Sequence, residues 1–236
     1  MIGALLPDKV ATAWLDDFTL AGLPLPEESA APPDGRPPGA SRALEFRAGR
    51  HCARTALTRL GVAPAPVPRG PDRAPRWPEG VVGSITHCRG YCAAAVARSS
   101  AFTAIGIDAE PDEPLPSVVL RRIALPAELR ALPTGAAWGR LLFSAKESVY
   151  KVWAPATGRW LGFDEAEVRF DPPAGRFEAS VLVPPFPTYS GRFLVSSGLA
   201  LTAIAVQEVE KDEPDRAAGA AGGGSAVADL GGNVHA

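Results

Sequence analysis

Two long segments with helical periodicity, set among shorter apolar runs, constrain the fold of this chain more than any other feature. In residues 41–60, apolar side chains recur every four positions, and Gly61 then interrupts the pattern. In residues 136–153, apolar side chains again fall at helical spacing, and we expect Pro155 to end that helix. The chain is therefore predicted to contain two amphipathic helices, one in each half.

Apolar runs of strand length accompany each predicted helix. Three of them separate the two helices, and four more follow the second helix as a meander. Each half therefore offers one helix and several strands, which predicts an α+β fold with a boundary near residue 104. No repeat is detectable in the sequence itself. The predicted strands are residues 81–85, 91–97, 102–108, 166–170, 176–182, 191–195 and 199–206.

Two stretches rich in small residues, proline and charge are predicted to lack regular structure. Residues 24–40 form a connection rich in proline and glycine. The end of the chain has little apolar surface to bury and much conformational entropy to lose. The predicted organisation is thus an N-terminal half, residues 1–104, a C-terminal half, residues 105–207, and a disordered tail, residues 208–236.

The composition restricts the classes of function. With 236 residues, 46% of them hydrophobic, the chain can bury a substantial core. Its net charge of −2 gives no overall attraction to nucleic acid. No run approaches the roughly 20 apolar residues that cross a bilayer, and the first twenty residues do not resemble a signal peptide. Only three cysteines are present, so we expect a cytoplasmic protein in a reducing compartment, bound to no membrane.

Two carboxylates, Asp108 and Glu110, end an apolar run of strand length. If the strand continues to Glu110, both side chains point to the same face. Neighbouring carboxylates repel each other unless a cation lies between them, and oxygen ligands suit magnesium. The alternative is a solvated strand end that turns at Pro111, which the spacing alone favours.

The second helix carries Lys146, Glu147 and Lys151. Glu147 and Lys151 are one turn apart and share a face, which is compatible with a catalytic pair or with a surface ion pair. Ser144 and Glu147 also match a capping box, but the apolar pattern begins upstream and places Ser144 inside the helix. The ion-pair interpretation stays open at this point.

Basic residues gather on the first helix and in the loop after it. Arg47, Arg50 and Arg54 align on one face, Arg42 lies near enough to converge on the same ligand, and Arg69 and Gly70 follow in a loop rich in proline. Arginine binds phosphate through two parallel hydrogen bonds, so several of these groups would suit a ligand with several phosphates. The alternative is a solvated helix face in a chain rich in arginine.

Three segments, taken in their order, closely resemble the signature motifs of Sfp-type 4′-phosphopantetheinyl transferases. They are GSITH (residues 83–87), IGIDAEP (105–111) and FSAKESVYK (143–151). RHCAR (50–54) and WLGF (160–163) further resemble the enterobactin-type branch, which includes actinobacterial members. The resemblance covers roughly residues 41–206 and implies a pseudo-twofold pair of α+β subdomains with the active site in the cleft between them.

The resemblance implies a chemical role for each motif. Asp108, Glu110 and Glu147 match the ligands of Mg²⁺, with Mn²⁺ as a second candidate metal. Glu147 also matches the base that accepts the proton of the carrier serine, and Lys146 or Lys151 would stabilise the leaving 3′,5′-ADP. The matching positions for coenzyme A, the substrate, are Arg42, Arg50, Arg69, Gly70, Ser84, Thr86, His87, Asp108, Lys146 and Lys151.

The implied activity transfers the phosphopantetheine arm of coenzyme A to a serine of an apo acyl or peptidyl carrier protein. Such carriers serve fatty acid, polyketide or nonribosomal peptide synthesis, and residues 115–133 are a candidate docking segment. The resemblance further implies a monomer. Alternatives are an inactive module that binds coenzyme A or a carrier, and a magnesium phosphodiesterase that removes the arm. A zinc site built from His51, Cys52, His87, Cys88 and Cys92 is a further alternative, although its spacing is unusual.

Overall fold

The computed structural model describes residues 1–28, 39–70 and 73–208. Most of the predicted connection and of the predicted tail therefore lies outside the described residues. The strands are β1 (Ala11–Leu15), β2 (Val81–Cys88), β3 (Tyr91–Arg98), β4 (Phe102–Pro111), β5 (Ala166–Asp171), β6 (Arg176–Val181), β7 (Thr188–Ser196) and β8 (Leu199–Gln207). The α-helices are α1 (Ala40–Arg59), α2 (Ser117–Ile123), α3 (Pro126–Ala131) and α4 (Ala136–Thr157), with short 3-10 helices η1 (Ile2–Leu5), η2 (Phe18–Leu20), η3 (Pro26–Glu28) and η4 (Phe163–Glu165).

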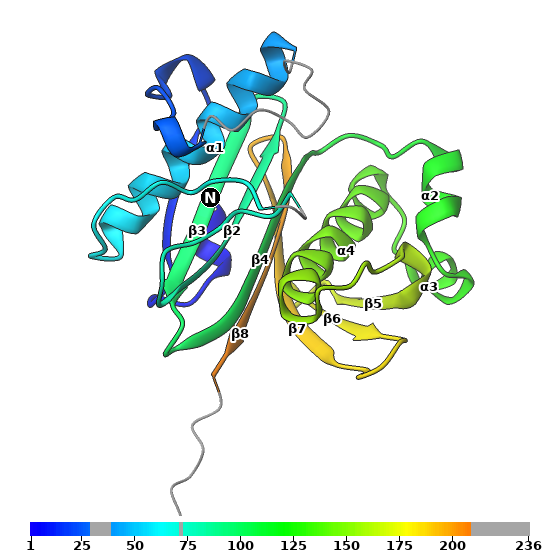
Figure 1. Ribbon diagram of the computed structural model, residues 1–236. Helices are drawn as coiled ribbons and strands as arrows, with labels where there is room; N and C mark the ends of the chain where they lie inside the picture. Colours follow the sequence, from blue (N-terminus) through cyan, green and yellow to red (C-terminus); the bar gives the residue numbers. More distant parts are fainter. Residues whose placement is uncertain (29–38, 71–72, 209–236) are drawn as a thin grey trace, which may run out of the picture.

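The first sheet contains three antiparallel strands in the order β1-β3-β2. Helix α1 covers one of its faces, as Figure 1 shows. The four-residue periodicity predicted from the sequence places Ala48, Cys52 and Ala56 in the core, where they pack with Ala94 and Val96 of β3. These small side chains allow the helix to lie close to the sheet.

The second sheet contains five antiparallel strands in the order β4-β8-β7-β6-β5. Helix α4 lies across it, with Val149, Val152 and Trp153 in a core shared with Val168 of β5 and Ile204 of β8. Each sheet thus carries one long helix, and the predicted α+β class is confirmed. Within the described residues, none of these helices combines the length and the apolarity that a membrane span requires.

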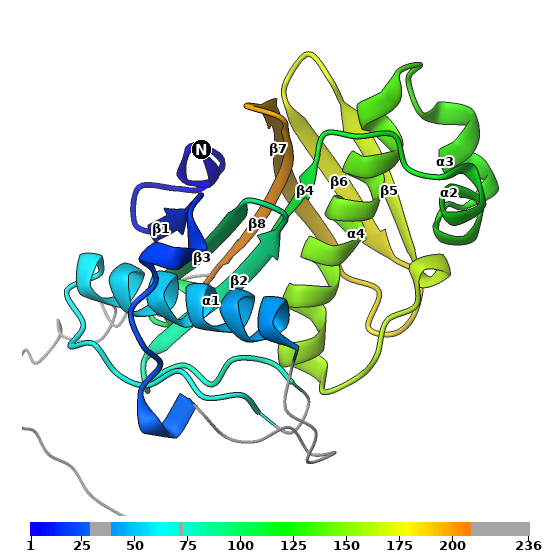
Figure 2. The ribbon, with the colours of Figure 1, turned by 90° about the horizontal axis from the view of Figure 1, so that it is seen from above.

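The two sheets meet where β2 lies beside β4, as Figure 2 shows from above. On the face of β3 and β4 that points away from the two long helices, a third core joins the halves. The first residues of the chain complete this core, because Ile2 and Leu5 of η1 are buried there. Their neighbours in the same cluster include Tyr91 of β3, Ile107 of β4 and Leu201 of β8.

The structure corrects one predicted helix boundary. Helix α4 does not end before Pro155, as we expected, but continues through Pro155 to Thr157. Pro155 lies in the final turn, so its missing N–H removes a hydrogen bond without breaking a further run of helix. Gly158, with a φ of 66°, adopts the left-handed conformation that ends the helix.

Several elements were absent from the sequence-based prediction. Helices α2 and α3 contain seven and six residues, which is too short for a helical periodicity to appear. Strand β1 was not predicted either. Strands β2 and β4 extend three residues beyond their predicted ends, and in β4 this extension carries the strand past Glu110.

Gly106 of β4 sets the distance between this strand and helix α4. A Cβ atom at Gly106 would lie 2.1 Å from the backbone oxygen of Ser148. Real Cβ atoms do not approach a backbone oxygen this closely, and neither backbone can move without disturbing its own element. The absence of a side chain at Gly106 therefore brings the central turns of α4 onto β4.

We expect Gly106→Ala to lower the free energy of unfolding by about 3 kcal/mol or more, because the added methyl group must push α4 away from the sheet. Gly139→Ala is the matched control. Its Cβ would meet only side-chain atoms at 3.5 Å, and alanine is the better helix former by about 1 kcal/mol. Urea unfolding curves of both variants measure the difference. Equal midpoints for the two variants would contradict the role of Gly106.

Candidate active site

Alternate residues of β4 face helix α4. Asp108 and Glu110 both contact this helix, through Lys151 and Arg140 respectively. Ala109, between them, is buried in the core on the other side of the sheet. The prediction that the two carboxylates share one face is therefore confirmed.

The Lys151 side chain contacts strand β4 and not Glu147, which lies one turn before it on α4. Its Nζ donates to Asp108 Oδ1 at 2.7 Å and to the Ile107 carbonyl at 2.9 Å. Among the ion pairs of the described residues, the partner of Lys151 is Asp108 and not Glu147. The alternative of a surface ion pair between Glu147 and Lys151 is therefore wrong for this structure.

Asp108 is the most constrained of the three acidic residues. Its Oδ1 accepts hydrogen bonds from Lys151 and, at 3.2 Å, from Thr86 Oγ1. Its Oδ2 is buried and has no hydrogen-bond partner among the described residues. A buried carboxylate oxygen without a donor is costly, and a bound cation would offset that cost.

The electrostatics around Asp108 also suit a cation. Burial, together with the nearby charge of Asp108, raises the pKa of Glu110 to about 7. Burial raises the pKa of Glu147 as well, and Asp108 adds to that rise while Lys151 opposes it. The negative charge of Asp108 thus disfavours the ionised forms of Glu110 and Glu147. As arranged, however, no group of three acidic, histidine or cysteine side chains within the described residues is assembled to hold a metal ion.

Arg140 explains part of this arrangement and was missed by the sequence-based analysis. Its Nη1 donates to Glu110 Oε2 at 3.2 Å, while its other nitrogens donate to the carbonyls of Glu113 and Pro114. It therefore draws Glu110 toward the start of α4. The available signal was its position seven residues before Glu147, which places both on one helix face.

The Lys146 side chain does not lie beside Asp108, Glu110 and Glu147. Its ammonium group is buried, with 3% of the residue exposed, and donates to the carbonyls of Ile123 and Phe163 and to Glu128 Oε2 at 2.6–2.8 Å. Burial lowers its pKa, and the charge of Glu128 opposes this shift. The amine has three protons and all three are used, so the geometry does not support the expected catalytic contact of Lys146 with substrate.

Ser84 and Thr86 join the two sheets. The Ile107 N–H donates to Ser84 Oγ at 3.1 Å, and the Ala109 N–H donates to Thr86 Oγ1 at 3.0 Å. Both hydroxyl groups are buried and point from β2 into the backbone of β4. These hydrogen bonds show that the two hydroxyls connect β2 to β4, and the expectation that Ser84 and Thr86 flank the coenzyme A phosphates stays a prediction.

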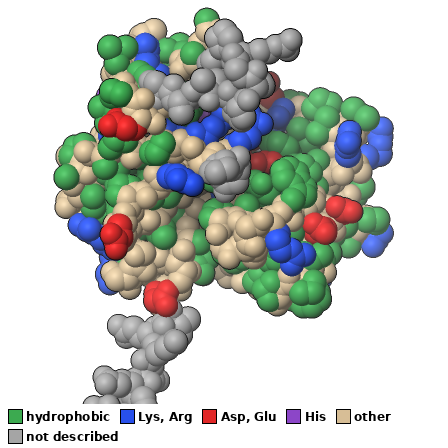
Figure 3. All heavy atoms as spheres, viewed as in Figure 1, with side chains coloured by type: hydrophobic (Ala, Val, Ile, Leu, Met, Phe, Trp, Pro, Cys, Tyr) green, Lys and Arg blue, Asp and Glu red, His purple; other side chains and the backbone are tan. Residues whose placement is uncertain are grey.

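The arginines expected to bind phosphates lie close enough to influence one another. Burial lowers the pKa of Arg50 to about 10, and the charge of Arg69 contributes to that shift. Burial and the charges of Arg73 and Arg42 lower the pKa of Arg69. Figure 3 shows Lys and Arg side chains gathered near the centre of one face of the molecule. Like charges held together in this way favour a bound anion.

Individual members of this basic group differ in how they are held. Arg50 is 6% exposed, lies 4.4 Å from the centre of the Phe46 ring, and has an Nε without a hydrogen-bond partner among the described residues. Gly70 is buried, and its N–H donates to the Ala74 carbonyl at 2.7 Å. Arg54 is paired with Glu28, and its charge also contributes to the lowered pKa of Arg50.

The histidines and cysteines do not form the alternative zinc site. His51 Nδ1 accepts a hydrogen bond from the Gly22 N–H at 3.2 Å, and His87 Nδ1 lies 3.8 Å from Glu45 Oε2. Burial lowers the pKa of His87. The Cys52 thiol lies 3.7 Å from the Cys92 carbonyl in the core of the first sheet. Within residues 1–28, 39–70 and 73–208, no cluster of these side chains could hold a metal ion.

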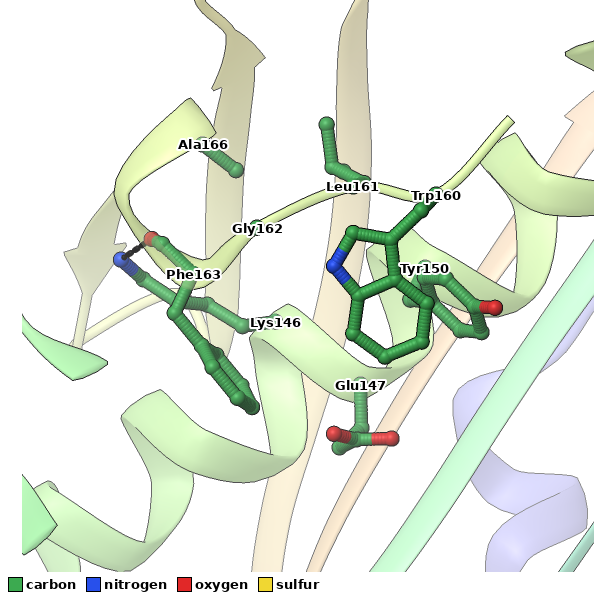
Figure 4. A pocket seen from close by; sticks show the side chains of 8 residues that line it. All are labelled: Lys146, Glu147, Tyr150, Trp160, Leu161, Gly162, Phe163 and Ala166. Atoms are coloured by element: carbon green, nitrogen blue, oxygen red, sulfur yellow. Dashed lines mark hydrogen bonds between the residues drawn. The ribbon is translucent and has the colours of Figure 1, made fainter. Parts of the chain in front are cut away.

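A pocket of about 70 Å³ lies beside Glu147. Figure 4 shows Glu147 below the rings of Tyr150 and Trp160, whose centroids are 5.0 Å apart. Lys146 points away from these rings toward the carbonyl of Phe163. The pocket joins an apolar wall to one carboxylate at the surface of α4. Its full lining is Lys146, Glu147, Tyr150, Trp160, Leu161, Gly162, Phe163 and Ala166.

Comparison with known proteins places the chain in a family. The model of the 4′-phosphopantetheinyl transferase N-terminal domain matches residues 38–97, and that of the 4′-phosphopantetheinyl transferase superfamily matches residues 104–202. The chain therefore belongs to the 4′-phosphopantetheinyl transferase superfamily.

Two relatives align with most of the chain, and a third aligns with just over half of it. The 4′-phosphopantetheinyl transferase PptT of Mycobacterium tuberculosis is 44% identical over 226 residues, which cover 86% of this chain and 98% of the relative. The 4′-phosphopantetheinyl transferase Svp of Streptomyces mobaraensis is 46% identical over 247 aligned residues, covering 97% of this chain and 98% of the relative. Enterobactin synthase component D of Salmonella typhimurium is 37% identical over 142 residues, 56% of this chain and 57% of that protein.

We expect Thr86→Val to lower the free energy of unfolding by about 1–3 kcal/mol, because the buried Ala109 N–H loses its acceptor. Thr103→Val is the control, since the exposed Thr103 hydroxyl only donates to the Val206 carbonyl at 3.3 Å. That change should stay within about 0.5 kcal/mol. Chemical denaturation of the two variants measures these changes. Equal losses of unfolding free energy would mean that the Thr86 hydroxyl does not stabilise the contact between the two sheets.

Proposed function

We propose that this chain transfers the phosphopantetheine arm of coenzyme A to a serine of an apo acyl or peptidyl carrier protein and releases 3′,5′-ADP. The observation that carries the proposal is the likeness, across nearly the whole chain, to relatives named 4′-phosphopantetheinyl transferases. The site adds chemical support, because it offers a basic group for phosphates and an acidic group for a metal on the two sides of the β2–β4 junction.

Magnesium is the metal that we propose, with manganese as an alternative. Asp108, Glu110 and Glu147 would hold it, because all their donors are oxygen and Asp108 Oδ2 is buried without a partner. When bound, the ion would offset the negative charge of the carboxylates and of the coenzyme A pyrophosphate. Glu110 would have to give up part of its contact with Arg140 to hold the ion.

Two residues near Asp108 carry out the proton transfer and the charge stabilisation of the proposed reaction. The carrier serine Oγ forms a bond to the β-phosphorus of coenzyme A, and the bond from that phosphorus to the oxygen of 3′,5′-ADP breaks. Glu147 accepts the serine proton, because its carboxylate borders the pocket. Lys151, held against Asp108, stabilises the charge on the leaving phosphate.

Coenzyme A is bound on both sides of the junction in this proposal. Arg42, Arg50, Arg69 and His87 take the nucleotide phosphates, and the turn at Gly70 presents Arg69. The pocket beside Trp160 takes the pantetheine arm, because it is apolar and adjoins Glu147. Ser84, Thr86 and Lys146 contribute by holding elements in place rather than by touching substrate.

The finer expectations from the sequence also belong to this proposal. We divide the chain into an N-terminal half of residues 1–104, which binds the nucleotide, and a C-terminal half of residues 105–207, which carries the chemistry. We further propose a cytoplasmic monomer whose partners are carrier proteins of fatty acid, polyketide or nonribosomal peptide synthesis. Residues 115–133, which contain α2 and α3, are the proposed docking segment.

The test is the intact mass of several apo carrier proteins before and after incubation with this protein, coenzyme A and Mg²⁺. One added phosphopantetheine per carrier supports the transferase. No gain on any carrier, with folded protein that binds coenzyme A, would favour the inactive binding module. Loss of the arm from a holo carrier would favour the phosphodiesterase.

We expect Glu147→Gln to lower kcat by about 10²–10⁴-fold, because the amide cannot accept the serine proton. Affinity for coenzyme A should change far less. Glu178→Gln, on the exposed side of β6, is the matched control and should keep the wild-type rate. Steady-state transfer rates and calorimetric titration with coenzyme A give the two quantities. A Glu147→Gln enzyme with wild-type turnover would remove this residue from the mechanism.

A further inference from the structure

Each half of the molecule contains a buried glutamate at the same place in a short sequence. Leu25-Pro-Glu-Glu28 and Leu125-Pro-Ala-Glu128 share the pattern Leu-Pro-x-Glu, and a short helix begins at the proline of each. Glu28 is 1% exposed and Glu128 is 3% exposed. Carboxylates are almost never buried to this degree unless they are paired and hydrogen-bonded.

The two glutamates make equivalent contacts. Glu28 Oε2 accepts from the Leu25 N–H at 2.9 Å and pairs with Arg54 of α1, and its Oε1 accepts from the Val67 N–H at 3.0 Å. Glu128 Oε2 accepts from the Leu125 N–H at 2.6 Å and from Lys146 of α4 at 2.8 Å, and its Oε1 accepts from the Val168 N–H at 2.7 Å. Each carboxylate thus ties its own turn, the long helix of its half and a later backbone segment.

The segments that Glu28 holds in place carry two arginines that we propose to bind the phosphates of coenzyme A. Arg54 lies one turn after Arg50 on α1, so its pairing fixes the part of the helix that presents Arg50. Val67 lies two residues before Arg69, so its bond fixes the start of the loop that presents Arg69. Glu28 therefore sets the relative position of two arginines that repel each other.

The segments fixed by Glu128 carry the proposed base and the pocket. Lys146 precedes Glu147 on α4, and its amine also holds the Phe163 carbonyl in the pocket wall. Val168 lies on β5, whose first residue, Ala166, lines the same pocket. Glu128 therefore sets where Glu147 stands relative to the wall opposite it.

We propose that Glu28 and Glu128 are equivalent positioning residues with separate effects on the reaction. Glu28 sets the affinity for coenzyme A through Arg50 and Arg69, whereas Glu128 sets the rate of transfer through Lys146 and Glu147. The inference rests on the proposed function. It adds that one buried carboxylate in each half controls one side of the site.

The experiment compares Glu28→Gln with Glu128→Gln, each of which removes a buried carboxylate of the same kind. Calorimetry with coenzyme A and no carrier gives Kd, and transfer at saturating coenzyme A and carrier gives kcat. For Glu28→Gln we expect Kd to rise about tenfold while kcat stays within about twofold. For Glu128→Gln we expect kcat to fall about 10- to 100-fold while Kd stays within about twofold, because small displacements of a catalytic group are costly.

The cationic partners provide a second pair of variants if a glutamate variant does not fold. Arg54→Gln should reproduce the rise in Kd, and Lys146→Gln should reproduce the fall in kcat. The double variant of Glu128→Gln and Lys146→Gln should lose less activity than the product of the two single losses, since each single change already removes the ion pair between them. Asp17→Asn, which removes an exposed capping carboxylate of η2, should change neither constant.

Several outcomes would overturn the inference. Thermal unfolding is measured for all variants. If Kd rises and kcat falls in proportion to the loss of stability, in the same way for the Glu28 and the Glu128 variants, the two glutamates have only a structural role. A raised Kd in Lys146→Gln, with Glu128→Gln unaffected, would instead indicate direct contact of Lys146 with coenzyme A. If the wild-type protein modifies no carrier, the proposed function fails; if it is active but the two constants do not separate, only this inference fails.

Discussion

The close approach of helix α4 to strand β4 is the constraint on which the site depends. Gly106 leaves room for the backbone of Ser148, and the next residues on that face of β4 are Asp108 and Glu110. With the strand and helix in contact, Lys151 reaches Asp108 and Arg140 reaches Glu110 without solvent between them. A wider spacing would leave the same charges in water, where they interact weakly. The packing of one glycine thus decides whether the charged residues act together.

Most regular elements followed from the sequence because they depend on local pattern. The helix over residues 41–60 and the strands that follow it were predicted from periodicity and glycine or proline boundaries, and the paired orientation of Asp108 and Glu110 followed from the alternation of a strand. The motif resemblance supplied the family. Local pattern could not reveal α2 and α3, which are too short, or the continuation of α4 past Pro155, where a helix was already near its end.

The partners of charged side chains were beyond such reasoning, because they come from distant parts of the chain. Lys146 and Glu147 are neighbours in sequence, yet a rotation of about 100° per residue sends one into the core and the other toward the pocket. The helix phase was available from the sequence, but Glu128 and the Phe163 carbonyl were not identifiable as the acceptors. Likewise the hydroxyls of Ser84 and Thr86 reach β4 only because the sheets meet at that edge.

The fluorescence of Trp160 should depend on whether the pocket is occupied. The indole is 74% exposed and lies beside Tyr150 at the mouth of the cavity next to Glu147. An indole in water emits at longer wavelength than one in apolar surroundings, so a ligand that covers Trp160 shifts its emission toward the blue. Trp153, by contrast, is fully buried and senses no such change. The protein therefore carries a native fluorescent reporter at the wall of its own site, with no dye or label required.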